Sequence, residues 1–347
     1  MSSQSTVTHH SAQQARANWI ALALLLGAIV LSLVGLGVGS TGFESVWQMW
    51  TRSHANLNQQ QTALQIIFDI RAPRTLGAFL AGALLGLSGA LAQGLFRNPL
   101  ADPFLLGSAS GASLGVALAL ALFGASPFAT QWVVRLGLTG VAFVGAIAAV
   151  FMTLMLAKGV QHTLRLLLAG VVVGVVLGAL ASLITIVSPE ILPAMQAFML
   201  GTSAYVGWMS CAVMAAVLLP CLLVSWMLAK VLDALSLGEA TAVSLGMPLH
   251  SLRMVLIVLM ALASGTAVAQ TGLIAFVGLV SPHLVRSLVK VTHGRMVMLS
   301  SLMGGVLLML ADIFARGLIA PQELPVGVLT AILGGGYLLW LMNKRAL

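Results

Sequence analysis

Asp312 and Arg316 have the residue types and spacing that could do chemistry. They lie four positions apart in one apolar run, which puts them on the same face of a helix. An acid inside a membrane-spanning segment is a candidate for proton transfer, but the nearby cation favours a structural ion pair that orients the guanidinium. The sequence contains no HExxH zinc motif and no Walker lysine. We therefore expect no enzymatic reaction in this chain.

The histidines and cysteines do not form a ligand set. His162, His283 and His293 fall at the ends of apolar runs, whereas a haem-bearing electron carrier needs paired axial ligands inside its spans. Cys211 and Cys221 share one apolar run and are expected to be small core residues. The prediction is that this chain itself binds no metal and no cofactor.

Arg316 and two further cations, Arg71 and Arg74, lie next to the ends of apolar runs. Long basic side chains in such places often anchor helix ends at lipid headgroups. They could instead meet carboxylates of a soluble partner, where charge pairs steer docking and fix register. The residues alone leave both readings open.

The polar segment 230–253 is the longest connection on its side of the expected membrane. Ser236-Leu-Gly-Glu239 has the spacing of a capping box, and Glu239 suits the positive end of a helix. Gly246 and Pro248 follow, so we predict two short helices joined by glycine. Such a knob could dock a soluble partner, or it could be a loop that merely ties two spans together.

The composition shows that lipid surrounds most of this chain. Of the 347 residues, 60% are hydrophobic and 7% charged, and the mean hydropathy is +1.07; soluble domains carry about 25% charged residues. The pI near 10.5 does not indicate nucleic-acid binding, because the cations are scattered between apolar runs instead of clustered on one face.

These charged residues must be positioned by membrane-spanning helices, and the fold class predicted is all-α and polytopic. A helix needs about 20 apolar residues to cross a bilayer. Residues 1–18 are expected to be a polar cytoplasmic tail, 19–342 a single membrane domain and 343–347 a C-terminal tail. Ten runs make up that domain: 19–39, 75–96, 104–124, 132–157, 164–187, 205–229, 253–268, 272–286, 297–317 and 325–342.

Ten spans put both termini on one side of the membrane, and the Lys and Arg residues predict that this side is the cytoplasm. Eleven of the 16 fall there: Arg16, Arg97, Lys158, Arg165, Lys230, Arg253, Arg286, Lys290, Arg295, Lys344 and Arg345. The other five are Arg52, Arg71, Arg74, Arg135 and Arg316.

Small residues recur every four positions, as in Gly82 and Gly86, in Gly107, Gly111 and Gly115, and in Gly170, Gly174 and Gly178. Each series predicts close helix packing. Gly334-Gly-Gly336 is expected to break the last span. Broken helices and mid-membrane ionisable residues are typical of secondary transporters, which is the rival class. Because the acids lie mostly at span ends, that class is disfavoured.

From about Trp19 to Met342 the chain resembles the permeases of type II ABC importers, the group that takes up ferric siderophores, haem and vitamin B12. The resemblance rests on motifs in this order: Arg71-Ala-Pro-Arg-Thr-Leu76, Gly94-Leu-Phe-Arg-Asn-Pro-Leu-Ala-Asp-Pro103, Arg165-Leu-Leu-Leu-Ala-Gly170, Gly238-Glu-Ala-Thr-Ala-Val-Ser-Leu-Gly246, Gly272-Leu-Ile-Ala-Phe-Val-Gly-Leu-Val-Ser-Pro-His-Leu-Val-Arg286, Leu310-Ala-Asp-Ile-Phe-Ala-Arg316 and Glu323-Leu-Pro-Val-Gly-Val-Leu-Thr330.

The resemblance implies a homodimer in the bacterial inner membrane, two ATP-binding cassette subunits that use ATP and Mg, and one periplasmic substrate-binding protein. It implies docking of the binding protein at Arg71, Arg74 and Arg316. The residues implied to couple to the ATPase are Leu237, Gly238, Glu239, Ala240, Thr241, Ser244, Leu245 and Gly246.

The resemblance also implies a cytoplasmic gate near Asn98, Leu100, Thr163 and Leu164. This sequence departs from the family pattern there, because Leu164 stands where a second small hydroxyl is expected and His162 precedes Thr163. For the substrate, a ferric siderophore is expected, with haem and cobalamin as alternatives. Met195 and Met199 could face haem, but methionine as apolar filler is favoured.

Overall fold

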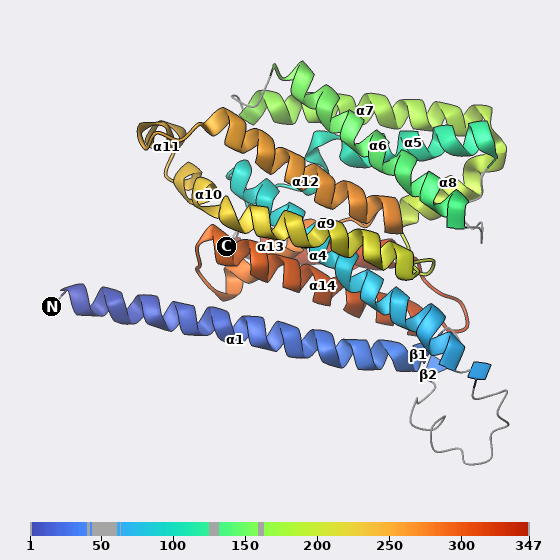
Figure 1. Ribbon diagram of the computed structural model, residues 1–347, viewed down its shortest axis with the longest axis horizontal. Helices are drawn as coiled ribbons and strands as arrows, with labels where there is room; N and C mark the ends of the chain where they lie inside the picture. Colours follow the sequence, from blue (N-terminus) through green and yellow to red (C-terminus); the bar gives the residue numbers. More distant parts are fainter. Residues whose placement is uncertain are drawn as a thin grey trace, which may run out of the picture.

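A computed structural model describes residues 2–39, 42–43, 61–62, 64–124, 132–158 and 163–345. Long helices lie side by side in one bundle (Figure 1). The only strands in these ranges are the two-residue β1 (Val38–Gly39) and β2 (Gly42–Phe43), which pair antiparallel. The structure therefore confirms the all-α fold.

Each of the ten predicted runs coincides with a helix. Eight are long and apolar enough to cross a membrane, whereas α5 and α13 are shorter. The ten are α1 (Ser2–Gly37), α4 (Ala72–Leu95), α5 (Ser108–Phe123), α6 (Trp132–Leu156), α7 (Thr163–Val187), α9 (Trp208–Met227), α12 (Leu249–Thr271), α13 (Val277–Leu288), α14 (His293–Gly317) and α15 (Val326–Arg345).

Short elements connect these helices. The π-helix η1 (Ile66–Arg71) leads into α4, and the 3-10 helix η2 (Pro103–Leu106) precedes α5. The 3-10 helix η3 (Pro189–Ile191) and α8 (Leu192–Leu200) follow α7. Between α9 and α12 lie α10 (Ala229–Ser236) and α11 (Glu239–Ser244).

Three boundaries differ from the sequence prediction. Helix α12 has 23 residues, so the run predicted at 253–268 can cross a bilayer on its own. Helix α15 continues through Gly334–Gly336, because three glycines leave the backbone hydrogen bonds of a helix intact. Helix α1 begins at Ser2, so the polar N-terminal segment prolongs the first helix.

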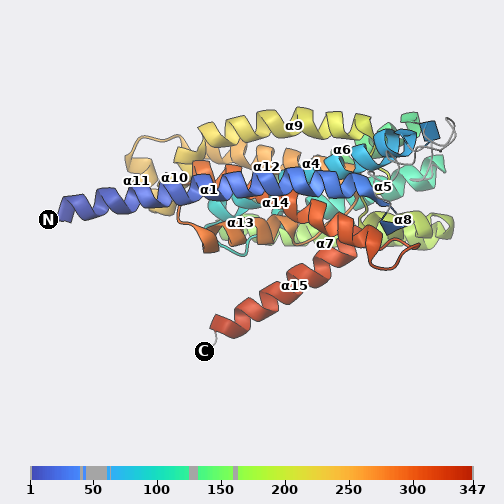
Figure 2. The same cartoon turned by 90° about the horizontal axis from the view of Figure 1, so that it is seen from below.

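Helix α4 is the centre of the bundle. It packs against α14, α12, α13 and α9, and Leu84, Leu87 and Leu91 on it are inaccessible to solvent. By contrast, most of α1, α7, α9 and α15 faces outward with apolar side chains. Seen from the side, α15 diverges from the bundle (Figure 2). A core helix enclosed by apolar outer helices is the arrangement expected where lipid is the solvent.

Glycines let the backbones of α4 and its neighbours touch. A Cβ atom at Gly86 would lie 2.1 Å from the carbonyl oxygen of Ser300 on α14, and one at Gly89 would lie 1.7 Å from that of Gly278 on α13. Gly111 meets Gly145 of α6 in the same way. Gly107, which was predicted to belong to that helix face, instead caps α5 with φ +81°. The predicted small-residue packing is confirmed for α4 and α5.

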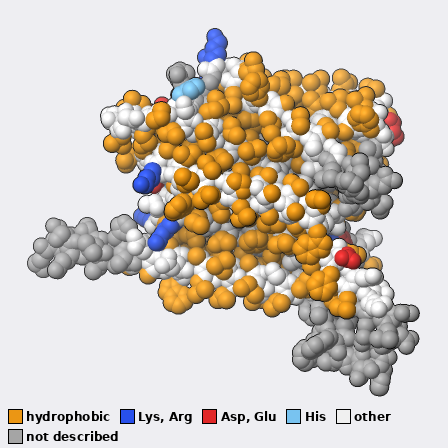
Figure 3. Space-filling model, viewed as in Figure 1, with side chains coloured by type: hydrophobic (Ala, Val, Ile, Leu, Met, Phe, Trp, Pro, Cys, Tyr) orange, Lys and Arg blue, Asp and Glu red, His pale blue; other side chains and the backbone are white. Residues whose placement is uncertain are grey.

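The two ends of the bundle differ. Helix α1 begins and α15 ends at the end that carries α11, whereas α8 and the strands β1 and β2 lie at the opposite end (Figures 1 and 2). On the face seen in Figure 3, apolar side chains cover the middle, and Lys and Arg appear toward the α11 end. We call these the α11 end and the α8 end.

Candidate functional site

Helices α10 and α11 form a knob at the α11 end, but the predicted capping box is wrong. Ser236 ends α10, and its hydroxyl donates to the carbonyl oxygen of Asp233 at 2.6 Å. Gly238, with φ +112°, joins the two helices, and Glu239 is the first residue of α11. The tight turn requires the positive φ that glycine tolerates. This turn therefore ends α10 at the position where the predicted capping box would have started a helix.

The surface of the knob is partly apolar. Leu237, Val243 and Leu245 are 69%, 61% and 62% exposed, while Ala242 between them is buried. Ala240, Thr241, Ser244 and Gly246 are exposed as well, and Gly238 and Glu239 are partly exposed. Three large apolar side chains on one short extramembrane segment form a surface that a protein partner can cover. Val243 was missing from the predicted coupling set.

Two acids fasten the knob to the bundle. Asp233 of α10 accepts hydrogen bonds from the backbone N–H of His293 at 3.0 Å and pairs with its ring Nδ1 at 2.7 Å, at the start of α14. Glu239 accepts from the guanidinium of the buried Arg253 on α12, and Arg97 lies 3.6 Å from the same oxygen. The knob is thus joined to α14, to α12 and to the loop after α4.

That loop contains two of the predicted gate residues. Asn98 and Leu100 are exposed, and the Asn98 side chain accepts from the backbone N–H of Leu100 at 2.9 Å. Leu164 at the start of α7 is also exposed. Thr163 begins α7 and only its backbone is described; His162 lies outside the described residues. The loop lies at the same end of the molecule as the knob, because Arg97 contacts Glu239.

Asp102 shapes the same loop. Its carboxylate accepts from the backbone N–H of Phe104 at 2.8 Å and caps η2. Burial raises the pKa of Asp102 to about 6, and the hydrogen bond from Phe104 opposes that rise.

At the α8 end, Arg71, Arg74 and Arg316 are buried, with 7%, 7% and 1% of their surfaces exposed. Arg71 donates to the carbonyl oxygens of Leu36 and Gly37 at the end of α1 at 3.2 and 3.4 Å, where a cation is favoured by the helix dipole. None of the three is an exposed cation in this chain by itself. Each guanidinium has a hydrogen-bond or ion-pair partner within the chain, because an unpaired charge in a poorly solvated region is unfavourable.

Asp312 is the centre of a charged network that holds two of these arginines. It binds Arg316, as the i,i+4 spacing predicted, and accepts from Arg74 Nε at 3.1 Å. The Ser203 hydroxyl also donates to it, and Arg74 Nη1 contacts Glu323 at 2.8 Å. We call Arg74, Asp312, Arg316, Ser203 and Glu323 the Asp312 network.

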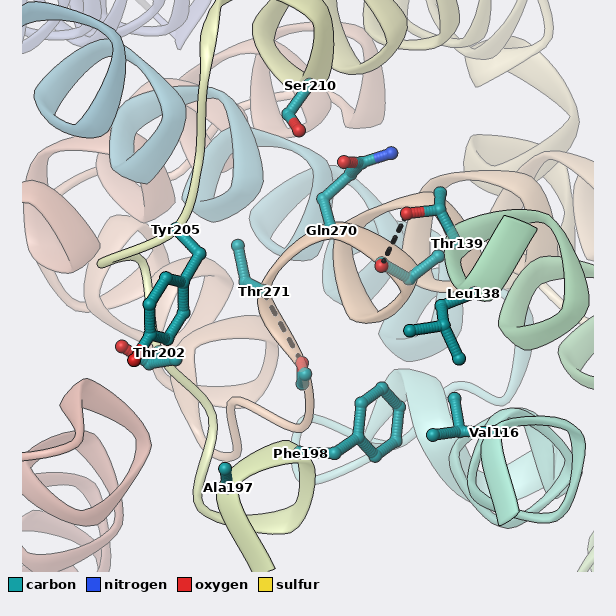
Figure 4. Close-up of a pocket in the computed structure, with 12 residues that line it drawn as sticks. Val116, Leu138, Thr139, Ala197, Phe198, Thr202, Tyr205, Ser210, Gln270 and Thr271 are labelled. Carbon is teal, nitrogen blue, oxygen red and sulfur yellow. Dashed lines mark hydrogen bonds between the residues drawn. The ribbon is translucent and has the colours of Figure 1, made fainter. Parts of the chain in front are cut away.

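A small cavity lies near this end between α5, α6, α8, α9 and α12. Figure 4 shows Gln270, Thr139 and Phe198 among the side chains that line it. The Thr139 hydroxyl donates to the carbonyl oxygen of Ala269 at 3.3 Å. The volume of this cavity is about 110 Å³. An apolar groove between α13, α14 and α15 has a volume of about 210 Å³. Pockets for drug-sized ligands have about 300–1,000 Å³, so neither space holds a bulky metal chelate.

Sequence reasoning missed the partners that lie far away in the chain. Ser203 and Glu323 join the Asp312 network, and Arg97 and Arg253 join Glu239, across separations that no local pattern reveals. The spacing Gly-x-Ser-x-Gly does occur at residues 111–115, but it lies within α5. It lacks the strand-to-helix turn that exposes a nucleophilic serine.

Comparisons with known proteins agree over nearly the whole chain. A sequence model of the FecCD transport family matches residues 23–344. The hemin transport system permease protein HmuU of Yersinia pestis is 36% identical over 325 residues, which are 93% of this chain and 96% of the relative. The vitamin B12 import system permease protein BtuC of Pectobacterium atrosepticum is 36% identical, covering 96% and 97%. An iron chelatin transport system permease protein of Helicobacter pylori is 36% identical, covering 94% and 97%.

Two solved structures share the fold. One, an inward-facing conformation of a metal-chelate type ABC transporter, has a TM-score of 0.79 and 30% identity over 94% of this chain and 99% of that one. The other, PsaBC from Streptococcus pneumoniae in complex with Fab, has a TM-score of 0.55 and 22% identity over 76% and 88%. At that identity, the second supports the fold alone.

Proposed function

Since this chain belongs to the FecCD transport family and is the permease subunit of a type II ABC importer, we propose that it moves a ferric siderophore or a similar iron complex from periplasm to cytoplasm. The observation that carries the proposal is the family match over residues 23–344. Relatives named for hemin or an iron chelate support an iron complex, but relatives named for vitamin B12 are as similar or more similar, so the names do not choose the substrate. Vitamin B12 and haem are the alternative substrates.

The translocation path forms, in this proposal, between two copies of the chain. Neither measured space in the single chain is large enough for a chelate. Helices α7 and α15 expose apolar side chains over most of their lengths, among them Val175, Ile186 and Leu339. A second copy can cover such faces while leaving a central passage at the symmetry axis. The bilayer covers the rest.

The knob docks the ATPase subunit. The ATPase subunit, and not this chain, binds ATP and Mg. Its exposed apolar residues suit a protein interface, and Glu239 links it to Arg97, next to Asn98 and Leu100. ATP-driven closure of the two ATPase subunits would move α11 and, through that link, the loop proposed as the cytoplasmic gate with Thr163 and Leu164. Alternating access needs no covalent chemistry from the permease.

The α8 end docks the periplasmic binding protein. Acidic groups on the two lobes of that protein pair with Arg71, Arg74 and Arg316. All three have partners within the single chain, so docking at Arg74 would exchange one of its carboxylate partners. The α11 end then faces the cytoplasm with both termini, in agreement with the positive-inside rule.

Uptake by cells with and without this gene tests the proposal. Cells would be given radiolabelled ferric siderophores, haem and cobalamin in parallel. Loss of ferric siderophore uptake alone is the expected result. Loss of only haem or only cobalamin uptake would retain the importer and overturn the substrate. If uptake of all three persisted and no ATPase co-purified with the chain, a secondary transporter would replace the proposed mechanism.

A further inference from the structure

We propose that Glu323 is an internal stand-in for a carboxylate of the docking partner: it occupies Arg74 in the undocked permease and leaves when an acidic group of the binding protein takes its place. The inference rests on the proposed function, in which Arg74 meets the binding protein. Beyond the proposed function, it names Glu323 as the residue that must be displaced. It also predicts in which direction removal of the Glu323 charge changes the affinity for the binding protein.

Glu323 is the member of the Asp312 network best placed to leave. Asp312 is fully buried and is held by Arg74, Arg316 and the Ser203 hydroxyl together. Glu323 has 28% of its side chain exposed, and its one ion pair in the described part of the chain is with Arg74 Nη1. It also lies on a connection, residues 318–325, and not on a helix. Detaching it therefore breaks no hydrogen bond within a helix and leaves Asp312 in place.

Exchange of one carboxylate for another suits the charge balance of this network. Arg74 and Arg316 offset Asp312 and Glu323, so the four groups sum to zero formal charge. If an incoming carboxylate approached Arg74 while Glu323 stayed, three carboxylates would share one guanidinium, because Asp312 and Glu323 already contact it, and the added like charge is unfavourable. If Glu323 left first, Arg74 would lose a partner in a poorly solvated region. Direct replacement avoids both costs.

The released segment leads into α15, so the exchange has a structural consequence. The connection is fixed to the bundle by a hydrogen bond from the backbone N–H of Leu324 to the carbonyl oxygen of Ala315 at 3.0 Å. The start of α15 is fixed by a hydrogen bond from the backbone N–H of Gly327 to the carbonyl oxygen of Gly201 at 3.2 Å. Helix α15 is otherwise among the least buried of the spanning helices. Docking at Arg74 would thus loosen the start of the helix proposed to line the path.

Binding of the importer's periplasmic binding protein to the purified permease in nanodiscs tests this inference. Glu323→Gln keeps an oxygen that can accept from Arg74 but removes the competing charge. It should tighten binding about fivefold at low salt. Glu190→Gln is the matched control, because Glu190 is an exposed acid of η3 at the same end and should change affinity less than twofold. Arg74→Gln should weaken binding at least tenfold.

A spin label at Gln322→Cys gives a second readout, since both native cysteines are buried. Docking should increase the mobility of the label, and Glu323→Gln should increase it without docking. If Glu323→Gln left affinity unchanged or weakened it while Arg74→Gln still impaired binding, the stand-in role would be overturned and the docking surface would stand. Equal tightening by Glu190→Gln would also overturn it. If Arg74→Gln had no effect, the proposed docking role of Arg74 would fail as well.

Discussion

At the scale of single residues, Asp102 is where pH should act on the proposed gate loop. Its pKa is raised from 3.8 to about 6 by burial, so the folded protein holds the proton more tightly than the unfolded chain. The stability that protonation of Asp102 contributes is complete below pH 3.8 and is lost as pH rises through 6. At neutral pH the buried carboxylate is therefore a net cost of at most about 3 kcal/mol.

Asp102→Asn should remove this pH dependence while keeping a capping oxygen, since Asn and Asp cap helices about equally well. The variant should unfold at a higher temperature than the parent at pH 7.5, and the two should converge at about pH 3.5, below the pKa of Asp102 in the unfolded chain. Tryptophan fluorescence reports unfolding at both pH values, since the chain contains seven Trp residues. A difference in unfolding temperature that is the same at both pH values would refute the assignment.

At the scale of elements, close contact between helix backbones should make Gly89 intolerant of any side chain. A Cβ atom there meets the carbonyl oxygen of Gly278 at 1.7 Å, and overpacking of this kind costs about 1–3 kcal/mol. Gly89→Ala should lower the unfolding temperature in detergent. Gly27→Ala on α1, where nothing lies within 4 Å, is the control and should be neutral or stabilising. Equal unfolding temperatures for the two variants would contradict the contact.

The apolar surface of the knob is a second element whose role can be measured. Val243→Ser with Leu245→Ser should weaken co-purification of the ATPase at least tenfold, because two exposed side chains lose the apolar area a partner would bury. The fold should survive, since Ala242 keeps the buried contact. Leu318→Ser, an exposed leucine after α14 at the opposite end, should leave the ATPase bound. Retention of the ATPase by the double variant would exclude the knob as the docking site.

At the scale of the whole molecule, two sets of polar contacts lie at opposite ends of one helix bundle. The Asp312 network ties α4 to α14 and to the connection before α15, and Glu239 ties the knob to α12 and to the loop after α4. Helix α4 runs from one set to the other and is the most buried of the long helices. It is therefore the element best placed to relate events at the two ends, while α7 and α15 expose the apolar faces proposed to meet a second copy.

The sequence by itself determined the all-α membrane fold, the ten helices, the family and the close glycine contacts. Runs of apolar residues and repeats of small ones are local patterns, and the bilayer converts them directly into spans and helix contacts. Only the tertiary structure decided that the three arginines are buried, that a turn at Gly238 joins α10 to α11, and that Glu323 and Arg97 are charge partners. Those outcomes depend on which groups meet across the bundle once water is excluded, and a pairing between residues up to 249 positions apart leaves no trace in a local pattern.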